Sequence, residues 1–295
     1  MIKIPSADGE INQYSLTNST ASDPRIIYVN GMQTDGRTHA KTAALISLIA
    51  ERPVSGVFNS TQGFVKDGLQ SGLDYIQNAL GRGSRNSLTP NRNVPPHEIP
   101  QLAEDIIQRS TFWNKATPTL FRTLMRNINS RQFIVAHSQG NLITSNALFV
   151  LQNALGSQAL SKIRVYSLAS PSPGWPLGLR HTNGGGGRQE NAFMNDFVAL
   201  LRPHNALKKT KDALKSSPLL SHKISGALMP NIQNAGDFRT HKDGGVVGLH
   251  AHDIQRNMAL NFVISIRRDL GLSVDVDPQA LVKKSDSRVE EILKP

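Results

Sequence analysis

The segment Phe133-Ile-Val-Ala-His-Ser-Gln-Gly-Asn-Leu142 decides the fold of this 295-residue chain. It opens on a run of apolar residues, as expected for a strand that is buried on both faces. From Asn141 to Leu155, apolar residues recur at helical spacing and give that stretch one apolar face. Between strand and helix, small residues stand two positions before and two positions after Ser138. Such residues let a strand and a helix approach closely, so we predict a sharp strand–turn–helix unit with Ser138 at the turn.

The same alternation of strand and helix extends on both sides of this unit. Residues 25–30 are apolar and β-branched, and residues 39–51 carry apolar side chains at helical spacing. Two further apolar stretches, 54–58 and 163–169, are predicted strands. This repetition is typical of βαβ units, whose strands pair in parallel. The predicted fold class is therefore α/β, with a mostly parallel central sheet flanked by helices.

The ends of the chain and two long stretches fit this rhythm less well. Residues 1–24 are predicted to form an edge hairpin or a loosely packed N-terminal segment. Residues 190–194 are predicted to form a short strand. We predict a last helix from about His252 to Asp269, and a polar, peripheral C-terminal tail over residues 273–295. Residues 1–272 then form a single domain with insertions at about 62–130 and 203–240, which are predicted to be helical and to cap the site.

The composition is that of a globular protein with a strong basic bias. Hydrophobic residues make up 38% of the chain, enough for a core, and a charged share of 19% argues against disorder. The net charge of +11 favours contact with anions, although a basic solubilising surface explains it equally well. The absence of cysteine excludes disulfides, thiolate metal sites and a cysteine nucleophile. No secretory signal and no spanning segment is evident in the sequence, so we expect the cytoplasm by default.

The segment Ala136-His-Ser-Gln-Gly140, with its flanking strand and helix, resembles the nucleophile elbow of the α/β-hydrolases. The Ala-His-Ser-x-Gly form is similar to that of the small bacterial lipases. The resemblance covers roughly residues 25–60, 132–200 and 240–268. It implies an α/β-hydrolase of the lipase and esterase type, in which Ser138 attacks a carboxylic ester and forms an acyl-enzyme. The alternative is a serine that merely caps the following helix.

A serine hydroxyl needs a base that is held by an acid, and in this fold the chain order is serine, acid, histidine. Asn195-Asp-Phe-Val-Ala-Leu200 resembles the family's Asp-x-Val segment after a late strand, which implies that Asp196 is the acid. Asp237 and Asp243 are rivals, because both lie close in sequence to the candidate histidines. A helix-capping role for Asp196 also stays open.

For the base, His250-Ala-His-Asp253 precedes the predicted last helix, where the family's histidine lies. The apolar residues that follow fit the family's spacing better when counted from His252 than from His250. The resemblance therefore implies His252 as the base, with His250 as the alternative and His241 as a third candidate. The His-x-His spacing would also suit a metal, but no acidic or cysteine cluster joins it, so we predict neither a metal nor another cofactor.

The oxyanion of an acyl-transfer intermediate needs two backbone N–H donors. The resemblance implies that Gln139, the residue after the nucleophile, supplies one of them. Tyr28-Val-Asn-Gly-Met32 resembles the His-Gly-apolar element of lipases, with Asn30 in place of histidine, and implies Met32 as the second donor. An ordinary turn at the end of a strand is the alternative for this segment.

The basic insertion at 203–240 lies between the candidate acid and base, where it would overhang the site. Its lysines and leucines favour a helical segment whose basic face lies in water. The alternative is a helical segment that contacts an anionic membrane surface. The expected substrate is a small-molecule or lipid ester, and lipase, carboxylesterase, phospholipase A-type and thioesterase activities all remain open. The competing class is a basic, non-catalytic protein that binds nucleic acid or membrane. Aromatic residues make up 5% of the chain and do not alternate with basic runs, so we expect no nucleic acid.

Overall fold

The structure is a computed structural model that describes residues 2–19, 23–32, 34–60, 95–110, 112, 114–170, 175–176, 179, 187–191, 258 and 262–294. Within these residues a six-stranded sheet has the order β1-β3-β2-β4-β5-β6. The strands are β1 (Ile11–Tyr14), β2 (Arg25–Val29), β3 (Val54–Val57), β4 (Gln132–His137), β5 (Ile163–Leu168) and β6 (Gly187–Asn191). Strands β2 to β6 run parallel to their neighbours, and β1 pairs antiparallel with β3. The predicted α/β class with a mostly parallel sheet is confirmed.

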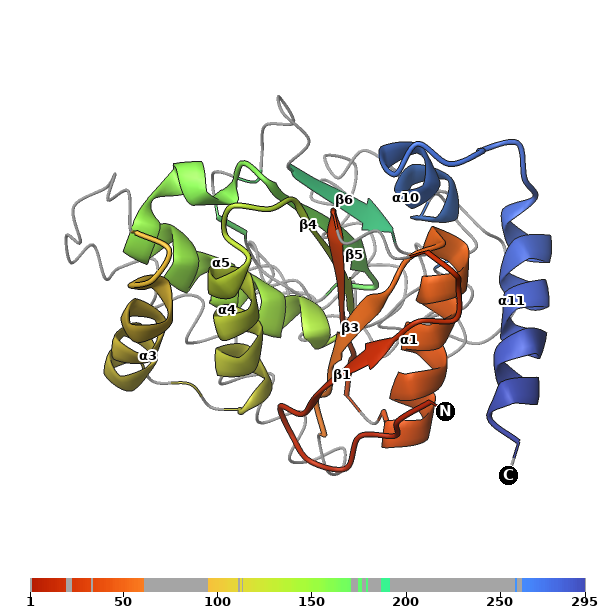
Figure 1. Ribbon diagram of the computed structural model, residues 1–295, viewed down its shortest axis with the longest axis horizontal. Helices are drawn as coiled ribbons and strands as arrows, with labels where there is room; N and C mark the ends of the chain where they lie inside the picture. The colour runs from red at the N-terminus through yellow and green to blue at the C-terminus, as the bar shows by residue number, and fades with distance from the viewer. Residues whose placement is uncertain are drawn as a thin grey trace, which may run out of the picture.

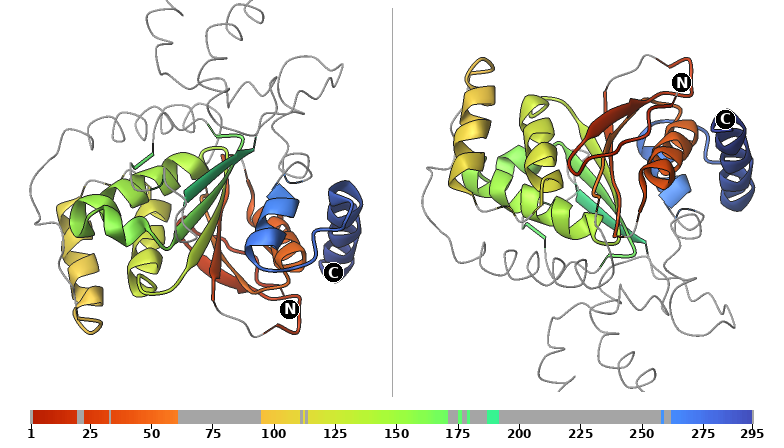
Figure 2. Two further views of the ribbon diagram at one scale, coloured as in Figure 1. Left: turned by 90° about the horizontal axis from the view of Figure 1, so that it is seen from above. Right: turned by 90° about the horizontal axis from the view of Figure 1, so that it is seen from below.

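Helices cover both faces of the sheet (Figure 1). One layer holds α1 (Gly36–Ala50), α10 (Val263–Asp269) and α11 (Pro278–Ile292). The opposite layer holds α3 (Ile99–Arg109), α4 (Ala116–Arg126) and α5 (Gly140–Leu155), followed by the short 3-10 helix η1 (Ser157–Leu160). Views from above and below separate the two layers clearly (Figure 2).

Strand β2 shows why the sheet must be covered twice. Ile26 and Tyr28 belong to the hydrophobic core on the α1 side, whereas Ile27 and Val29 belong to the core on the α5 side. Successive side chains of a strand point to opposite faces, so an unbroken apolar run requires a helix layer on each. All four side chains are at most 1% exposed, in agreement with the predicted doubly buried strand.

Helix α1 begins three residues before the start predicted from its apolar spacing. The Asp35 carboxylate accepts a hydrogen bond of 2.7 Å from the Thr38 N–H, a typical N-cap contact. The helix ends at Ala50, and its C-cap Glu51 takes a left-handed conformation (φ 51°) two residues before Pro53. Capping chemistry rather than hydrophobic periodicity therefore sets both ends.

Residues 99–126 fall within the insertion expected at 62–130, and the structure shows helices there. Helices α3 and α4 lie in that range, and their apolar faces are part of the main core with α5 and the sheet. Leu120, Phe121 and Leu124 are fully buried there. Their apolar side chains belong to the core on the α5 side, so both helices are part of the layer that covers this face of the sheet. Residues 61–94, and the second predicted insertion at 203–240, lie outside the described residues.

The N-terminal segment also differs from the expected hairpin. Strand β1 has no hairpin partner within residues 2–19; it pairs with β3, with Ile11 opposite Val57 and Tyr14 opposite Val54. Its side chains alternate between exposed and buried, as on an edge strand with one covered face. The edge position was anticipated, but a partner about forty residues away in the sequence was not.

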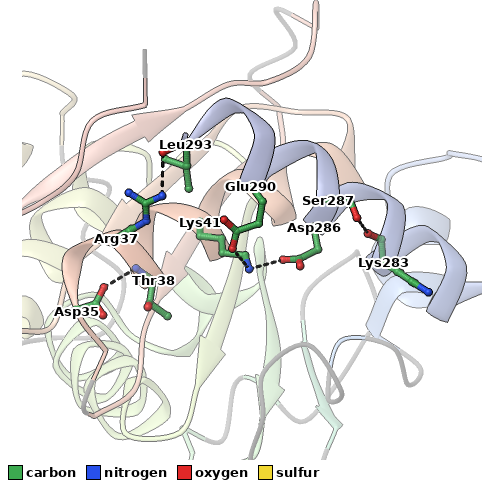
Figure 3. Close-up of polar contacts among 9 residues, drawn as sticks. All are labelled: Asp35, Arg37, Thr38, Lys41, Lys283, Asp286, Ser287, Glu290 and Leu293. Atoms are coloured by element: carbon green, nitrogen blue, oxygen red, sulfur yellow. Dashed lines mark hydrogen bonds and ion pairs between the residues drawn. The ribbon is translucent and has the colours of Figure 1, made fainter. Parts of the chain in front are cut away.

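The C-terminal segment folds as a helix on the outer side of α1 (Figure 3). The expected last helix is described as α10, and α11 follows it, within the stretch predicted to be a peripheral tail. Lys41 of α1 forms ion pairs with Asp286 (2.9 Å) and Glu290 (2.5 Å) of α11. Val282 and Val289 lie in the core cluster that α1 shares with the sheet. The tail is thus peripheral in position, but its apolar stripe is buried.

Candidate active site

Ser138 lies in the turn between β4 and α5, and it has a left-handed backbone (φ 53°). This conformation costs a residue other than glycine roughly 1–2 kcal/mol, and such strain is concentrated at functional sites. Hydrogen bonds from the Ser138 backbone and the Asn141 side chain hold the turn. The Ser138 N–H donates to the Leu168 carbonyl at 3.0 Å, and Asn141 Nδ2 donates to the carbonyls of Ser138 (3.1 Å) and Leu168 (2.9 Å).

Small residues make this turn possible, as the sequence predicted. A Cβ at Gly140 would lie 2.8 Å from the Asn30 carbonyl oxygen and closer still to that of Val29, so α5 starts in direct contact with the end of β2. Ala136, at the other small position, is fully buried. The predicted strand–turn–helix unit is therefore present, and glycine at position 140 is required by close packing rather than by a positive φ.

The Ser138 side chain is buried, with 1% of the residue exposed. Its Oγ has no hydrogen-bond partner in the described part of the chain. Buried polar atoms are nearly always paired, and an unpaired hydroxyl costs about 1–3 kcal/mol. Its close neighbour is Gly31, from the loop after β2: a Cβ there would lie 3.1 Å from Ser138 Oγ. Backbone from the neighbouring strand end thus lies directly against the hydroxyl.

The two predicted oxyanion donors come from the loops after β2 and β4, which are neighbouring strands. Met32 follows Gly31 directly, and Gln139 follows Ser138 at the start of α5. Neither backbone N–H donates a hydrogen bond to any residue that the structure describes. Both predicted donors therefore lie at the same edge of the sheet as Ser138.

Polar side chains interlock at this edge, directly after three adjacent parallel strands. Asn30 follows β2, Asn59 follows β3 by two residues, and Gln139 follows β4; all three are fully buried. Asn30 Nδ2 donates to the carbonyls of Gly31 (2.9 Å) and Asn59 (2.8 Å), and Asn30 Oδ1 accepts from the Asn59 N–H at 2.8 Å. Asn59 Nδ2 in turn donates to Gln139 Oε1 at 3.0 Å. We call these three residues the strand-end amide network.

His39, which lies in α1, contacts this network through Asn30. Its Nδ1 lies 2.8 Å from Asn30 Oδ1, and its ring packs among Tyr14, Tyr28 and Phe58. Burial lowers the pKa of His39 to about 3, so the imidazole is neutral at pH 7. Since Asn30 turns its nitrogen toward two carbonyls, its oxygen faces His39, and the Nδ1 of His39 must carry the proton.

Sequence reasoning noticed Asn30 only as a departure from a family pattern, and it missed Asn59 and His39. The sequence could have indicated Asn59, because it directly follows the predicted strand 54–58. In parallel sheets, ligand-binding residues lie just past the carboxyl ends of the strands. Nothing in the sequence indicated His39, since a histidine in an amphipathic helix is commonly a surface or structural residue.

The remaining predicted site residues, Asp196, His252 and the alternative His250, lie outside the described residues, as do Asp237 and Asp243. Among the described residues, no group of three or more histidine or acidic side chains could hold a metal ion. Within the same ranges no helix combines the length and the apolar character needed to cross a membrane.

Comparison with known proteins gave no match. No protein-family model, no curated protein and no solved structure matches the chain.

Proposed function

We propose that the protein is a serine hydrolase that cleaves carboxylic esters through an acyl-enzyme, with an α/β-hydrolase type of site. The observation that carries the proposal is Ser138 itself. It is a buried serine with a left-handed backbone between a strand and a helix, and its hydroxyl has no partner among the described residues. A helix-capping serine would have an extended backbone and an engaged hydroxyl, whereas a nucleophile held for attack needs neither.

The strand order supports a site at this place. Along the chain, β2 leads to β3 on one side of the sheet, and β4 leads to β5 and β6 on the other, so the order reverses between β2 and β4. Open α/β sheets bind ligands at the carboxyl ends of the strands where the order reverses. Gly31 and Ser138 follow these two strands, and they are in direct contact.

In the proposed reaction, Ser138 Oγ attacks the ester carbonyl carbon while its proton passes to the His252 imidazole, which Asp196 orients. The carbonyl oxygen becomes an oxyanion that accepts hydrogen bonds from the Met32 and Gln139 N–H groups. The intermediate collapses, the C–O bond to the alcohol breaks, and the imidazolium protonates the departing alcohol. A water molecule then repeats the sequence on the acyl-enzyme and releases the acid.

The position of β6 is compatible with this triad. Strand β6 is parallel to β5, so the chain leaves it at the same edge of the sheet as Ser138. Asp196 follows the last residue of β6, Asn191, by five positions in the sequence. His252 precedes Met258, which is buried in the core beside β4 and β5, by six positions. Each candidate therefore lies within six positions of a described residue of the sheet or of its core.

The test is covalent labelling combined with turnover. A fluorophosphonate should label Ser138 alone, and a panel of p-nitrophenyl esters and phospholipids of varied acyl length should identify the substrate class. Ser138→Ala should abolish both labelling and hydrolysis, whereas Ser287→Ala on the exposed side of α11 should leave both unchanged. Labelling of another serine, or parental turnover in folded Ser138→Ala, would refute the proposal.

The base is tested separately by comparing His252→Ala with His250→Ala. The variant that removes the true base should lose at least about a thousandfold in kcat, and the other should stay within a few-fold of the parent. Equal, small losses in both variants would exclude this histidine pair.

A further inference from the structure

We propose that Asn30 and Asn59 are positioning residues that orient both backbone donors of the oxyanion hole, those of Met32 and Gln139. This inference rests on the function proposed above. Neither side chain is expected to touch the substrate. Asn30 would act on the Gly31–Met32 peptide through the Gly31 carbonyl, and Asn59 would act on Gln139 through its side-chain amide.

Asn30 fixes the direction of the peptide between Gly31 and Met32. A trans peptide is planar, so its C=O and its N–H point in opposite directions. Asn30 Nδ2 holds the Gly31 carbonyl oxygen at 2.9 Å inside the strand-end amide network. The Met32 N–H must then point away from that network. Because glycine tolerates many backbone conformations, this peptide would otherwise be free to rotate.

The side-chain amide of Asn30 has only one available orientation. A side-chain amide offers two N–H groups and two lone pairs, and Asn30 uses all four. It donates to Gly31 and Asn59 and accepts from His39 and the Asn59 N–H. Rotating the fully buried amide would leave these groups unpaired, which is costly in a site without exposure.

Asn59 extends the strand-end amide network to Gln139, the residue of the other donor. Asn59 Nδ2 binds Gln139 Oε1 at 3.0 Å and so ties the first residue before α5 to the end of β3. The Gln139 N–H belongs to the unpaired donors at the start of this helix, where the helix dipole adds partial positive charge. One network therefore restrains the Gly31–Met32 peptide directly and Gln139 through its side chain, although the two donors lie 107 positions apart in the sequence (139 − 32).

The neutral state of His39 is part of this arrangement. With Nδ1 protonated, His39 donates to Asn30 Oδ1 and reinforces the orientation in which Asn30 Nδ2 faces Gly31. A network that served folding alone would change only the amount of folded enzyme. The experiment must therefore measure oxyanion stabilisation and not simply the amount of folded enzyme.

Oxo- and thionoesters of the same alcohol and acid provide that measurement. Sulfur accepts hydrogen bonds much more weakly than oxygen, so an oxyanion hole raises the ratio of oxoester to thionoester kcat. A loss of folded protein lowers both rates and leaves the ratio unchanged. We expect Asn30→Ala to lower the oxoester kcat about tenfold to a hundredfold with little change in KM, and the ratio by a similar factor; this is less than the hundredfold to thousandfold loss from removing a donor outright.

The matched control is Asn114→Ala. Asn114 is also buried, and its Oδ1 accepts hydrogen bonds from Thr117 N (2.7 Å) and Thr117 Oγ1 (2.9 Å) at the start of α4. Its loss should destabilise the fold without changing the ratio. If Asn30→Ala does not fold, Asn59→Ala carries the same test, because it keeps the backbone pairing to Asn30 and removes only the bond to Gln139. That variant should lower the ratio severalfold.

The outcomes separate the two proposals. An unchanged ratio in a folded Asn30→Ala or Asn59→Ala variant of an active parent would overturn the positioning role and leave the esterase proposal intact. A parent that neither hydrolyses esters nor reacts with fluorophosphonate at Ser138 would refute the proposed function, and with it this role.

Discussion

Gly31 and Ser138 pack backbone against side chain: a Cβ at position 31 would lie 2.5 Å from Ser138 Cβ and 3.1 Å from its Oγ. The two residues follow neighbouring parallel strands, so the contact joins the ends of β2 and β4. No side chain fits between them. The absence of a Cβ at Gly31 is therefore a condition for the position of the candidate nucleophile.

Gly31→Ala should displace Ser138 and lower kcat for ester hydrolysis by at least about a hundredfold, because a misplacement of about 1 Å has that effect on reacting groups. Gly271→Ala is the control, since no atom lies within 4 Å of a Cβ there, although φ is +71°. It should retain parental activity. Steady-state kinetics on a p-nitrophenyl ester would decide, and full activity in Gly31→Ala would show that the loop is not held against Ser138.

The left-handed backbone of Ser138 predicts an unusual order of stabilities. Ser138→Gly should be more stable than Ser138→Ala by about 1 kcal/mol, because glycine adopts a positive φ without strain. At Ser287, in the middle of α11, the order should reverse, since alanine is the better helix former by about 1 kcal/mol. Urea unfolding of the four variants measures both differences. The same order at both positions would contradict the strained turn.

His39 predicts a loss of stability in acid. Its pKa is lowered by burial from 6.5 to about 3, so between these values the unfolded chain binds a proton that the folded protein does not. The free energy of unfolding should therefore fall as the pH drops from about 6.5 to about 3, by up to about 1.4 kcal/mol per pH unit from this group. Above pH 6.5 the group contributes no pH dependence.

His39→Asn should flatten this part of the pH profile, because asparagine can donate to Asn30 Oδ1 without titrating. His97→Asn serves as the control, since the His97 side chain is 81% exposed. Denaturant unfolding between pH 3 and pH 8 measures the slope, which is independent of any overall loss of stability from the cavity. Equal slopes in the parent and His39→Asn would exclude a buried neutral imidazole.

The contact between α1 and α11 predicts that apolar burial matters more than the ion pairs. Val289 is fully buried, and Val289→Ala should cost about 2 kcal/mol through lost transfer energy and the cavity it leaves. Lys41→Ala should cost much less, because Asp286 and Glu290 keep 23% and 48% of their side chains exposed. Thermal unfolding at low and high salt compares the two. A larger loss for Lys41→Ala would mean that the ion pairs hold α11.

Much of the fold could be predicted because it follows from local patterns of apolar residues along the chain. The stretches 25–30, 54–58 and 163–169 are strands within a residue or two, since a strand buried on both faces needs an unbroken apolar run. Helix α5 likewise begins at Gly140 and ends at Leu155, close to its predicted bounds. Helices α3 and α4 could be predicted only in part. Their apolar stripes are evident in the sequence, but a stripe does not indicate which surface of the protein the helix packs against.

The sequence by itself determined that Ser138 stands in a sharp turn between a buried strand and an amphipathic helix. Small residues at 136 and 140 suffice for this inference, because strand, turn and helix are adjacent in the chain. The tertiary structure alone decided that Gly31 would lie against Ser138, and that Asn30, Asn59 and Gln139 would share one hydrogen-bond network. These partners come from different strands, and their proximity follows from the strand order. The strand order depends on how the apolar faces of all the strands and helices are buried together. A local sequence pattern contains no information about that arrangement.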